Sequence, residues 1–193
     1  MPLIPTVSPR TLTSITGADV PVPDPGRLTH LQFRRFAGCP VCTLHLRSFV
    51  ARKDQIDAAG IREVIVFHSG ADELRKYEAD LPLDVIADPD RLLYREFGVE
   101  TAPRAVLDPR AWPTIVRAVA HAAVASARRR RPVPPLRPDG GSLGLPADFL
   151  VGPDGHVLAA KHGAHADDQW SVDELLSLTP VTWQMTRHPG PSE

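Results

Sequence analysis

The chain has 193 residues, of which 42% are hydrophobic, so it can bury one core and still carry segments around a single domain. Its formal net charge is −1, so the surface as a whole has no broad basic field and we expect no nucleic-acid partner. No run of residues is apolar and long enough to cross a membrane, and we expect no membrane partner either.

Residues 1–27 are interpreted as a Pro-rich N-terminal extension, with six prolines before position 26. They contain no basic stretch followed by an apolar run, so they do not resemble a secretory signal peptide. We therefore expect a cytoplasmic protein. In that compartment a close pair of cysteines is more often catalytic or metal-binding than a structural disulfide.

A strand, a cysteine-bearing loop and a helix are expected in series near the start of the main domain. Residues 28–36 alternate loosely between apolar and polar side chains, which is typical of a strand that enters the core. Helical spacing follows directly, with Pro40 suited to the first helical position and Gly60 to the end. Cys39 and Cys42 lie at this strand-to-helix junction.

The rest of the chain alternates between short apolar runs and helical segments, which predicts an α/β fold with a central mixed sheet flanked by helices. Residues 101–144 interrupt this alternation and are interpreted as a helical insertion before the closing hairpin. We expect the apolar stripe of the insertion to be buried against the core, although gating of the cysteines and a dimer contact stay open. Ser69 or Asp72 is expected to cap the helix that follows and runs through Tyr77. The expected elements are strands at 63–67 and 84–87, helices at 72–77, 91–97 and 112–124, a hairpin of 147–151 and 156–161, and a last helix at 171–178.

The cysteine pair predicts thiol-dependent redox chemistry. Cys39 precedes the helix, so its sulfur lies near unpaired backbone N–H groups and the positive end of the helix dipole, which stabilise a thiolate. Cys42 is one helical turn further on the same face, within the Cα separation of roughly 4.4–6.8 Å that a disulfide tolerates. We therefore expect Cys39 to be the nucleophile and Cys42 the resolving residue. Arg34 and Arg35 point in alternate directions, so at most one faces the sulfur and stabilises the thiolate.

Three other interpretations of the pair stay open. The cysteines can be buried and inert, they can bind zinc together with His162 and His165, or they can form a redox sensor without turnover. His45 follows Cys42 on the same helical face and can stabilise or exchange a proton with the resolving thiol. We expect no metal and no other cofactor.

Several segments are similar to one known family. The residues from Phe36 to Cys42, which read Phe-Ala-Gly-Cys-Pro-Val-Cys, resemble the active-site turn of the thioredoxin-like superfamily, and within it the AhpC/TSA peroxiredoxin-like proteins with a CPxC centre. Residues 81–90 and 147–155 resemble the segment after the second strand and the closing hairpin of that family. The resemblance implies a thioredoxin-like redox domain over residues 28–178, followed by a C-terminal tail at 179–193.

The same resemblance implies a thiol oxidoreductase that reduces peroxides or exchanges disulfides. Its reductant would be a thioredoxin-type protein or a low-molecular-weight thiol, and a homodimer stays open. The resemblance also implies substrate-binding roles for Pro40, Leu145 and Pro146. Pro146 stands where these folds hold a cis-proline loop against the cysteines.

Two departures from typical peroxiredoxins concern the binding of peroxide. Phe36 occupies the position of the Thr or Ser that orients peroxide in those proteins. No arginine lies directly before the closing hairpin, so Arg104 or Arg137 could supply one only if the insertion folds back. The sequence therefore leaves peroxide reduction and disulfide exchange unseparated.

Overall fold

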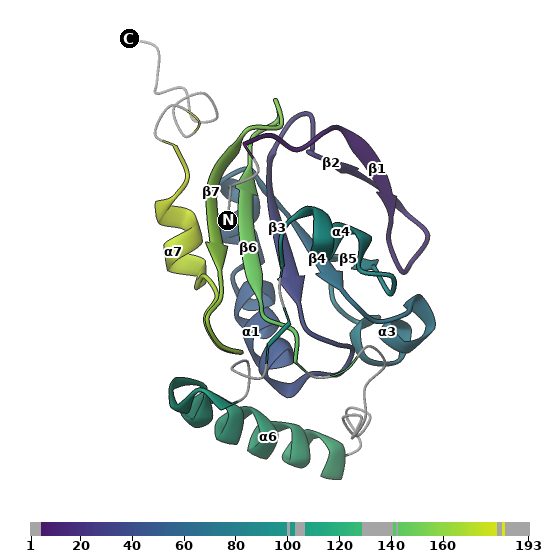
Figure 1. Cartoon of the computed structure of the whole chain (residues 1–193), viewed down its shortest axis with the longest axis vertical. Helices are drawn as coiled ribbons and strands as arrows, with labels where there is room; N and C mark the ends of the chain where they lie inside the picture. Colours follow the sequence, from purple (N-terminus) through teal and green to yellow (C-terminus); the bar gives the residue numbers. More distant parts are fainter. Residues whose placement is uncertain are drawn as a thin grey trace.

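The computed structural model describes residues 5–99, 101–102, 107–128, 141, 143–180 and 183. Its centre is a five-stranded sheet with the strand order β5-β4-β3-β6-β7 (Figure 1). β3, β4 and β5 are parallel, whereas β6 and β7 continue the sheet as an antiparallel hairpin. The expected α/β fold with a mixed sheet is confirmed. The strands are β3 Leu28–Arg34, β4 Ile61–Phe67, β5 Asp84–Ala87, β6 Ala147–Val151 and β7 Val157–His162.

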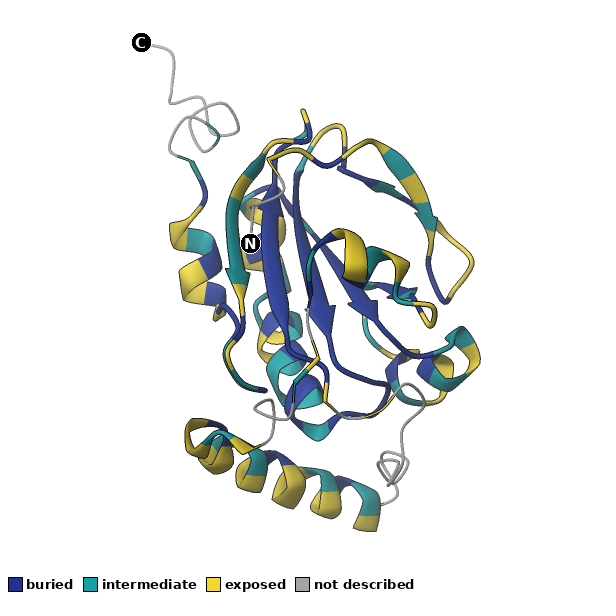
Figure 2. Ribbon diagram, in the orientation of Figure 1, coloured by how far each residue is buried: buried dark blue, intermediate teal, exposed yellow. Residues whose placement is uncertain are grey.

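Helices cover both faces of this sheet. One face packs against α1, α2, α3 and α7, and the other against α4 and a small hairpin of β1 and β2. Because both faces are covered, every residue of β3 and of β6 is buried (Figure 2). The remaining elements are β1 Arg10–Thr13, β2 Asp19–Val22, α1 Pro40–Ala51, α2 Lys53–Ala58, α3 Ala71–Glu78, α4 Leu92–Glu96, the 3₁₀ helix η1 Pro109–Ala111, α6 Trp112–Ala127 and α7 Val172–Ser177.

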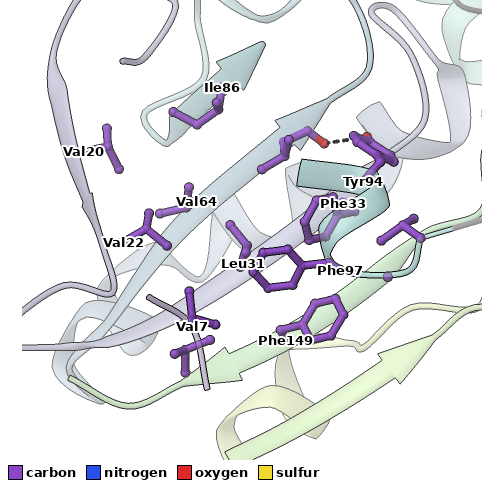
Figure 3. Packing of buried hydrophobic residues seen from close by; sticks show 14 residues of the cluster. Val7, Val20, Val22, Leu31, Phe33, Val64, Ile86, Tyr94, Phe97 and Phe149 are labelled. Carbon is purple, nitrogen blue, oxygen red and sulfur yellow. Dashed lines mark hydrogen bonds between the residues drawn. The ribbon is translucent and has the colours of Figure 1, made fainter. Parts of the chain in front are cut away.

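The face covered by α4 holds an aromatic core (Figure 3). Phe33 on β3 makes edge-to-face contacts with Tyr94 and Phe149, with ring centroids 5.0 and 5.8 Å apart. The buried hydroxyl of Tyr94 donates to the carbonyl oxygen of Val66 at 2.9 Å, which joins α4 to the sheet. Residues from the segment expected to be an extension join the same core: Val7, Val20 and Val22.

The start of α7 agrees with the helix expected from the sequence, but the helix expected between Pro40 and Gly60 is interrupted. Ser171 and Glu174 form the expected capping box at the start of α7. The single helix expected between Pro40 and Gly60 is instead two helices. Arg52 leaves the helical conformation, with φ −118° and ψ 20°, so that α1 ends before it and α2 begins after it.

Helix α6 lies across the end of the molecule toward which the parallel strands point, and it packs against α1 (Figure 1). The expectation that its apolar stripe is buried is wrong. Trp112, Val116 and Val119 are 58%, 64% and 52% exposed, whereas the small residues Ala118 and Ala125 face inward. Among the described residues, no helix is long and apolar enough to span a membrane.

Candidate functional site

The two cysteines lie at the loop between β3 and the start of α1. The backbone N–H of Cys39 donates to the carbonyl oxygen of Phe36, and Cys39 is the N-cap residue of α1. Gly38 has a φ of +73°, and a Cβ atom added there would lie 2.7 Å from the ring of Tyr77. The turn therefore depends on glycine both for its conformation and for the close packing of the loop on α3.

Side chains from the next strand and helix hold this loop. The hydroxyl oxygen of Ser69 accepts a hydrogen bond from the backbone N–H of Ala37 at 3.0 Å, and Glu78 accepts one from Gly38 at 3.2 Å. Ser69 was expected to cap α3, but the N-cap of that helix is Gly70, which makes no side-chain cap. The sequence analysis missed the role of Glu78, because it depends on a contact between residues forty positions apart.

The sulfur of Cys39 is surrounded by groups that favour a thiolate. The backbone N–H of Cys42 lies 3.5 Å from it, and Nη1 of Arg35 lies 3.8 Å from it. Burial by itself raises the pKa of Cys39. The hydrogen bond from the Cys42 side chain, the charge of Arg35 and the backbone N–H groups of Cys42 and Val41 outweigh burial and lower this pKa to about 7.

Cys42 has the opposite electrostatic character. Burial raises its pKa well above the ordinary value, and its hydrogen bond to Cys39 and the charge on that sulfur raise it further. Both cysteines are free thiols in this structure, and their exposed fractions are only 1% and 2%. The pair thus consists of one thiol whose lowered pKa makes a thiolate accessible near neutral pH and one neutral thiol that donates to it.

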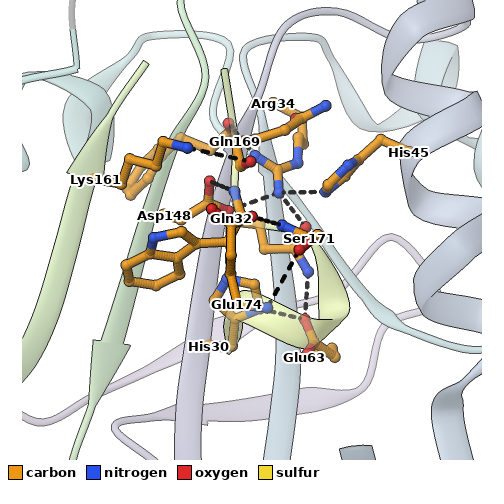
Figure 4. Close-up of polar contacts among 12 residues, drawn as sticks. His30, Gln32, Arg34, His45, Glu63, Asp148, Lys161, Gln169, Ser171 and Glu174 are labelled. Carbon is orange, nitrogen blue, oxygen red and sulfur yellow. Dashed lines mark hydrogen bonds and ion pairs between the residues drawn. The ribbon is translucent and has the colours of Figure 1, made fainter. Parts of the chain in front are cut away.

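Arg34 and Arg35 have different positions, as the alternation of β3 predicted. Arg35, just beyond the end of β3, reaches the sulfur of Cys39, whereas Arg34 points into a buried polar cluster (Figure 4). There, Nη2 of Arg34 lies 2.7 Å from Oδ1 of Asp148 and 3.2 Å from Nε2 of His45. Burial lowers the pKa of His45 well below its ordinary value, and the charge of Arg34 lowers it further. The structure thus places Arg34 and His45 together in a polar cluster and Arg35 alone at the thiolate.

This buried polar cluster extends along β3 from Arg34 to His30. Nδ1 of His30 lies 2.8 Å from Oε2 of Glu63, and its Nε2 lies 3.3 Å from Asp148, in the arrangement of an ion pair rather than of an aligned hydrogen bond. Gln32, between His30 and Arg34 on the same face, hydrogen-bonds to both Glu63 and Arg34. The cluster joins β3 to β4 and β6 behind the cysteine loop.

A cavity of about 330 Å³ opens beside Cys39, between the cysteine loop and α6. Arg35 and Cys39 provide its polar groups, and Pro40 lines it as the first residue of α1. Gating of the cysteines was one expected role of the insertion, but the sequence does not indicate which side chains of α6 line the cavity. The other lining residues are apolar: Phe36, Val41, Trp112, Ile115, Val116 and Val119.

Leu145 and Pro146 lie directly before β6 and are buried, but they are not among the residues that line this cavity. In the described part of the chain, the one cis peptide bond is Val22–Pro23, so the bond before Pro146 is trans. The preceding Gly144 lies beside the loop, since a Cβ atom there would lie 3.7 Å from Cα of Arg35. The candidate arginines Arg104 and Arg137 lie outside the described residues.

The residues considered for a zinc site have other partners. His162 lies with Nε2 3.1 Å from the carbonyl oxygen of Phe97, and His165 accepts a hydrogen bond from the backbone N–H of Asp167. No group of three or more His, Cys, Asp or Glu side chains gathers as metal ligands within the described ranges. The described side chains of His162 and His165 therefore do not form a ligand group with the two cysteines.

The family model for AhpC/TSA antioxidant enzymes matches residues 48–165, more than half of the chain. The chain belongs to this family. The expected AhpC/TSA and peroxiredoxin-like character is thus confirmed, and with it the class of thiol-dependent redox proteins. The matched region of the AhpC/TSA model begins after Cys42, so the roles of the two cysteines depend on the geometry described above.

Solved structures show that this AhpC/TSA protein has a thioredoxin-like fold. Peroxidoxin BcpB from Mycobacterium tuberculosis is 14% identical, with a TM-score of 0.58 and coverage of 97% of this chain and 96% of that one. StoA from Bacillus subtilis is 17% identical, with a TM-score of 0.55 and coverage of 93% and 100%. Peroxiredoxin Q from Xanthomonas campestris is 15% identical, with a TM-score of 0.57 and coverage of 92% and 91%. No curated protein sequence matches the chain.

Proposed function

We propose that the protein is a thiol peroxidase that reduces small-molecule peroxides, with Cys39 as the attacking residue and Cys42 as the resolving residue. The observation that carries this proposal is the position of Cys39, whose sulfur is almost fully buried beside Arg35 at an apolar cavity covered by α6. A small hydroperoxide fits such a cavity, whereas a disulfide on a folded protein needs an exposed sulfur to attack.

The chemistry proceeds in two steps that both use the arrangement of the pair. The Cys39 thiolate attacks the terminal oxygen of the peroxide, so that an S–O bond forms, the O–O bond breaks and the leaving alkoxide takes a proton to become an alcohol. Cys42, deprotonated as it attacks, then forms an S–S bond with the sulfenic sulfur of Cys39, and the hydroxyl leaves as water. A thioredoxin-type protein or a low-molecular-weight thiol supplies the two electrons that reduce the disulfide.

Arg35 provides the positive charge that the sequence lacks before the closing hairpin. It stabilises the Cys39 thiolate, and its guanidinium also lines the cavity in which the peroxide oxygens would lie. It therefore supports peroxide reduction although Phe36 replaces the hydroxyl residue of typical peroxiredoxins. We also infer a cytoplasmic location, because dithiols stay reduced there between turnovers.

The decisive experiment is stopped-flow oxidation of the reduced protein by hydrogen peroxide and by cumene hydroperoxide, with mass analysis of Cys39 and Cys42. We expect oxidation far faster than that of a free thiol, followed by closure of the internal disulfide. Cys39→Ser should abolish the reaction, because it removes the nucleophile. Cys42→Ser should still react once and should then accumulate a sulfenic acid, or a mixed disulfide when a small thiol is added.

Two results would contradict the proposal. Equal and undiminished activity of Cys39→Ser and Cys42→Ser would exclude the pair as the reaction centre. Peroxide oxidation no faster than that of a free thiol, together with rapid reduction of insulin disulfides, would assign the protein to disulfide exchange instead.

A further inference from the structure

The outward face of α6 is an apolar surface that no described part of the chain covers (Figure 2). With about 3.6 residues per helical turn, its exposed side chains form one continuous arc along the helix. The larger ones are more than half exposed, which is unusual for a Trp and several Val residues on one helix. We call this surface the α6 arc, and it consists of Trp112, Val116, Val119, Ala120, Ala123, Val124 and Ala127.

Basic side chains border one edge of the α6 arc. Arg117 and Arg128 are exposed and lie next to Val124 around the helix. In the sequence, residues 109–138 contain seven arginines and no Asp or Glu, so the rest of the chain carries a formal charge of −8 against −1 for the whole. The α6 arc is therefore apolar at its centre and bordered by cations that have no acidic neighbours in sequence.

The apolar centre and the basic edge of the α6 arc allow three candidate partners to be compared: a second copy of the chain, a nucleic acid and an anionic bilayer. A second copy placed on the α6 arc would bring the same arginines together without carboxylates from this segment to pair with them. A nucleic acid would bind the arginines but would leave Trp112 and the valines in water. An anionic bilayer can bind both the apolar and the basic side chains. The apolar side chains enter the boundary of the acyl chains while the arginines contact the headgroups.

We propose that the α6 arc binds peripherally to the surface of a bilayer that contains anionic phospholipids. The helix has 16 residues and lies on the protein body, which suits a helix in the plane of the interface rather than one that spans it. No membrane partner was expected from the sequence, because it contains no segment apolar and long enough to span a bilayer. The exposed position of α6 changes that expectation.

The α6 arc is continuous with the cavity beside Cys39. Trp112, Val116 and Val119 belong to both surfaces, so they are exposed on one side and line the cavity on the other. A bilayer bound to the α6 arc would therefore hold the entrance of this cavity at the interface. The binding itself does not depend on the proposed peroxidase activity and can be measured without it.

The test is co-sedimentation of the full chain with vesicles of phosphatidylcholine alone and with vesicles that also contain phosphatidylglycerol. We expect binding to the anionic vesicles, weakened by salt, with a blue shift of Trp112 emission that the Trp112→Phe variant lacks. Ala123→Glu/Val124→Glu should abolish binding, since it places two carboxylates in the α6 arc away from the cavity. Arg117→Gln/Arg128→Gln should weaken binding by roughly fivefold for each charge removed.

Leu158→Glu on β7 is the matched control, because Leu158 is another exposed apolar residue, 45% exposed, outside the α6 arc. This variant should bind like the wild type, and thermal unfolding should show that all variants are folded. Absence of binding to anionic vesicles would overturn the proposal, as would equal binding by the wild type and Ala123→Glu/Val124→Glu. Dimers that Ala123→Glu/Val124→Glu disrupts, without vesicle binding, would overturn it in favour of a contact between copies.

Discussion

Arg35 controls the chemistry of the cysteine pair at the level of a single residue. Its neighbour Arg34 has the same side chain and is also buried, but its guanidinium pairs with Asp148, whereas that of Arg35 lies beside Cys39. Of these two arginines, only Arg35 adds to the hydrogen bonds from Cys42 and Val41 that oppose the effect of burial on the pKa of Cys39. We therefore expect the reactivity of the Cys39 thiol at neutral pH to depend in part on Arg35.

Arg35→Met should raise the pKa of Cys39 and slow its oxidation at neutral pH. In the wild type this pKa is about 7, so the thiolate fraction and the peroxide rate should rise with pH around that midpoint. Without the guanidinium the midpoint moves to higher pH, and the rate at pH 7 falls several-fold. The pH profile of the stopped-flow rate and the ultraviolet absorbance of the thiolate measure both effects.

Arg75→Met is the control, because it removes the same charge from an exposed position on α3. Its profile should coincide with that of the wild type. An unchanged midpoint in Arg35→Met would show that the backbone N–H groups and Cys42 alone stabilise the thiolate.

At the level of elements, β3 has one apolar face and one polar face, and both are buried. The polar face binds β4 and β6 through His30, whose two ring nitrogens lie near Glu63 and Asp148. Burial by itself lowers the pKa of His30, but the charges of the two carboxylates and the hydrogen bond to Glu63 outweigh it and raise this pKa to about 9. Stability should therefore depend on pH through this histidine.

The free energy of unfolding should decrease between pH 6.5 and 9. The contribution of His30 is fully present below its unfolded pKa of 6.5 and is lost as pH rises through the folded value of about 9. The loss should amount to about 3 kcal/mol. Because the lowered pKa of Cys39 has the opposite effect over part of this range, the measurement belongs in a Cys39→Ser/Cys42→Ser background, by urea unfolding at several pH values.

In the same background, His30→Gln should have a lower free energy of unfolding below pH 6.5 than the protein with His30. Between pH 6.5 and 9 its free energy of unfolding should change little, because the titrating histidine is absent. His156→Gln, at an exposed position, is the matched control and should keep the decrease, since His30 is intact. An equal slope in all three proteins would mean that His30 is neutral in the folded state.

At the level of the whole molecule, stability should be highest at the sheet and lowest in the elements around it. β3 and β6 are buried over their whole length, whereas α6 has one face on α1 and the other in solvent. Amide hydrogen exchange followed by mass spectrometry should therefore be slowest in β3, β4 and β6 and clearly faster in α6. Equal protection of α6 and β3 would contradict this picture, and vesicles should slow exchange in α6 specifically.

The sequence predicted those features that depend on local order along the chain. The strand before Cys39, Pro40 at the start of α1 and the spacing of the cysteines all follow from residues within a few positions of one another. The capping box of α7 is local in the same sense. These features were predicted correctly because local geometry and spacing determine them.

Features that depend on distant contacts were missed. Ser69 has the composition of a helix cap, but its hydroxyl binds Ala37 on another loop. The apolar stripe of α6 has the same sequence pattern whether it faces the core or the solvent, and only the position of the helix at the end of the sheet decides between them. Likewise, alternation separates Arg34 from Arg35, but pairing with β6 decides which of them meets Asp148.

The contact between Arg35 and Cys39 also affects how strongly the oxidised pair attracts electrons. The guanidinium stabilises the reduced form, in which Cys39 carries a negative charge, but it gains no such interaction from a neutral disulfide. Stabilisation of the reduced form raises the reduction potential of a dithiol pair. We therefore expect Arg35→Met to have a lower reduction potential for the Cys39–Cys42 pair than the wild type.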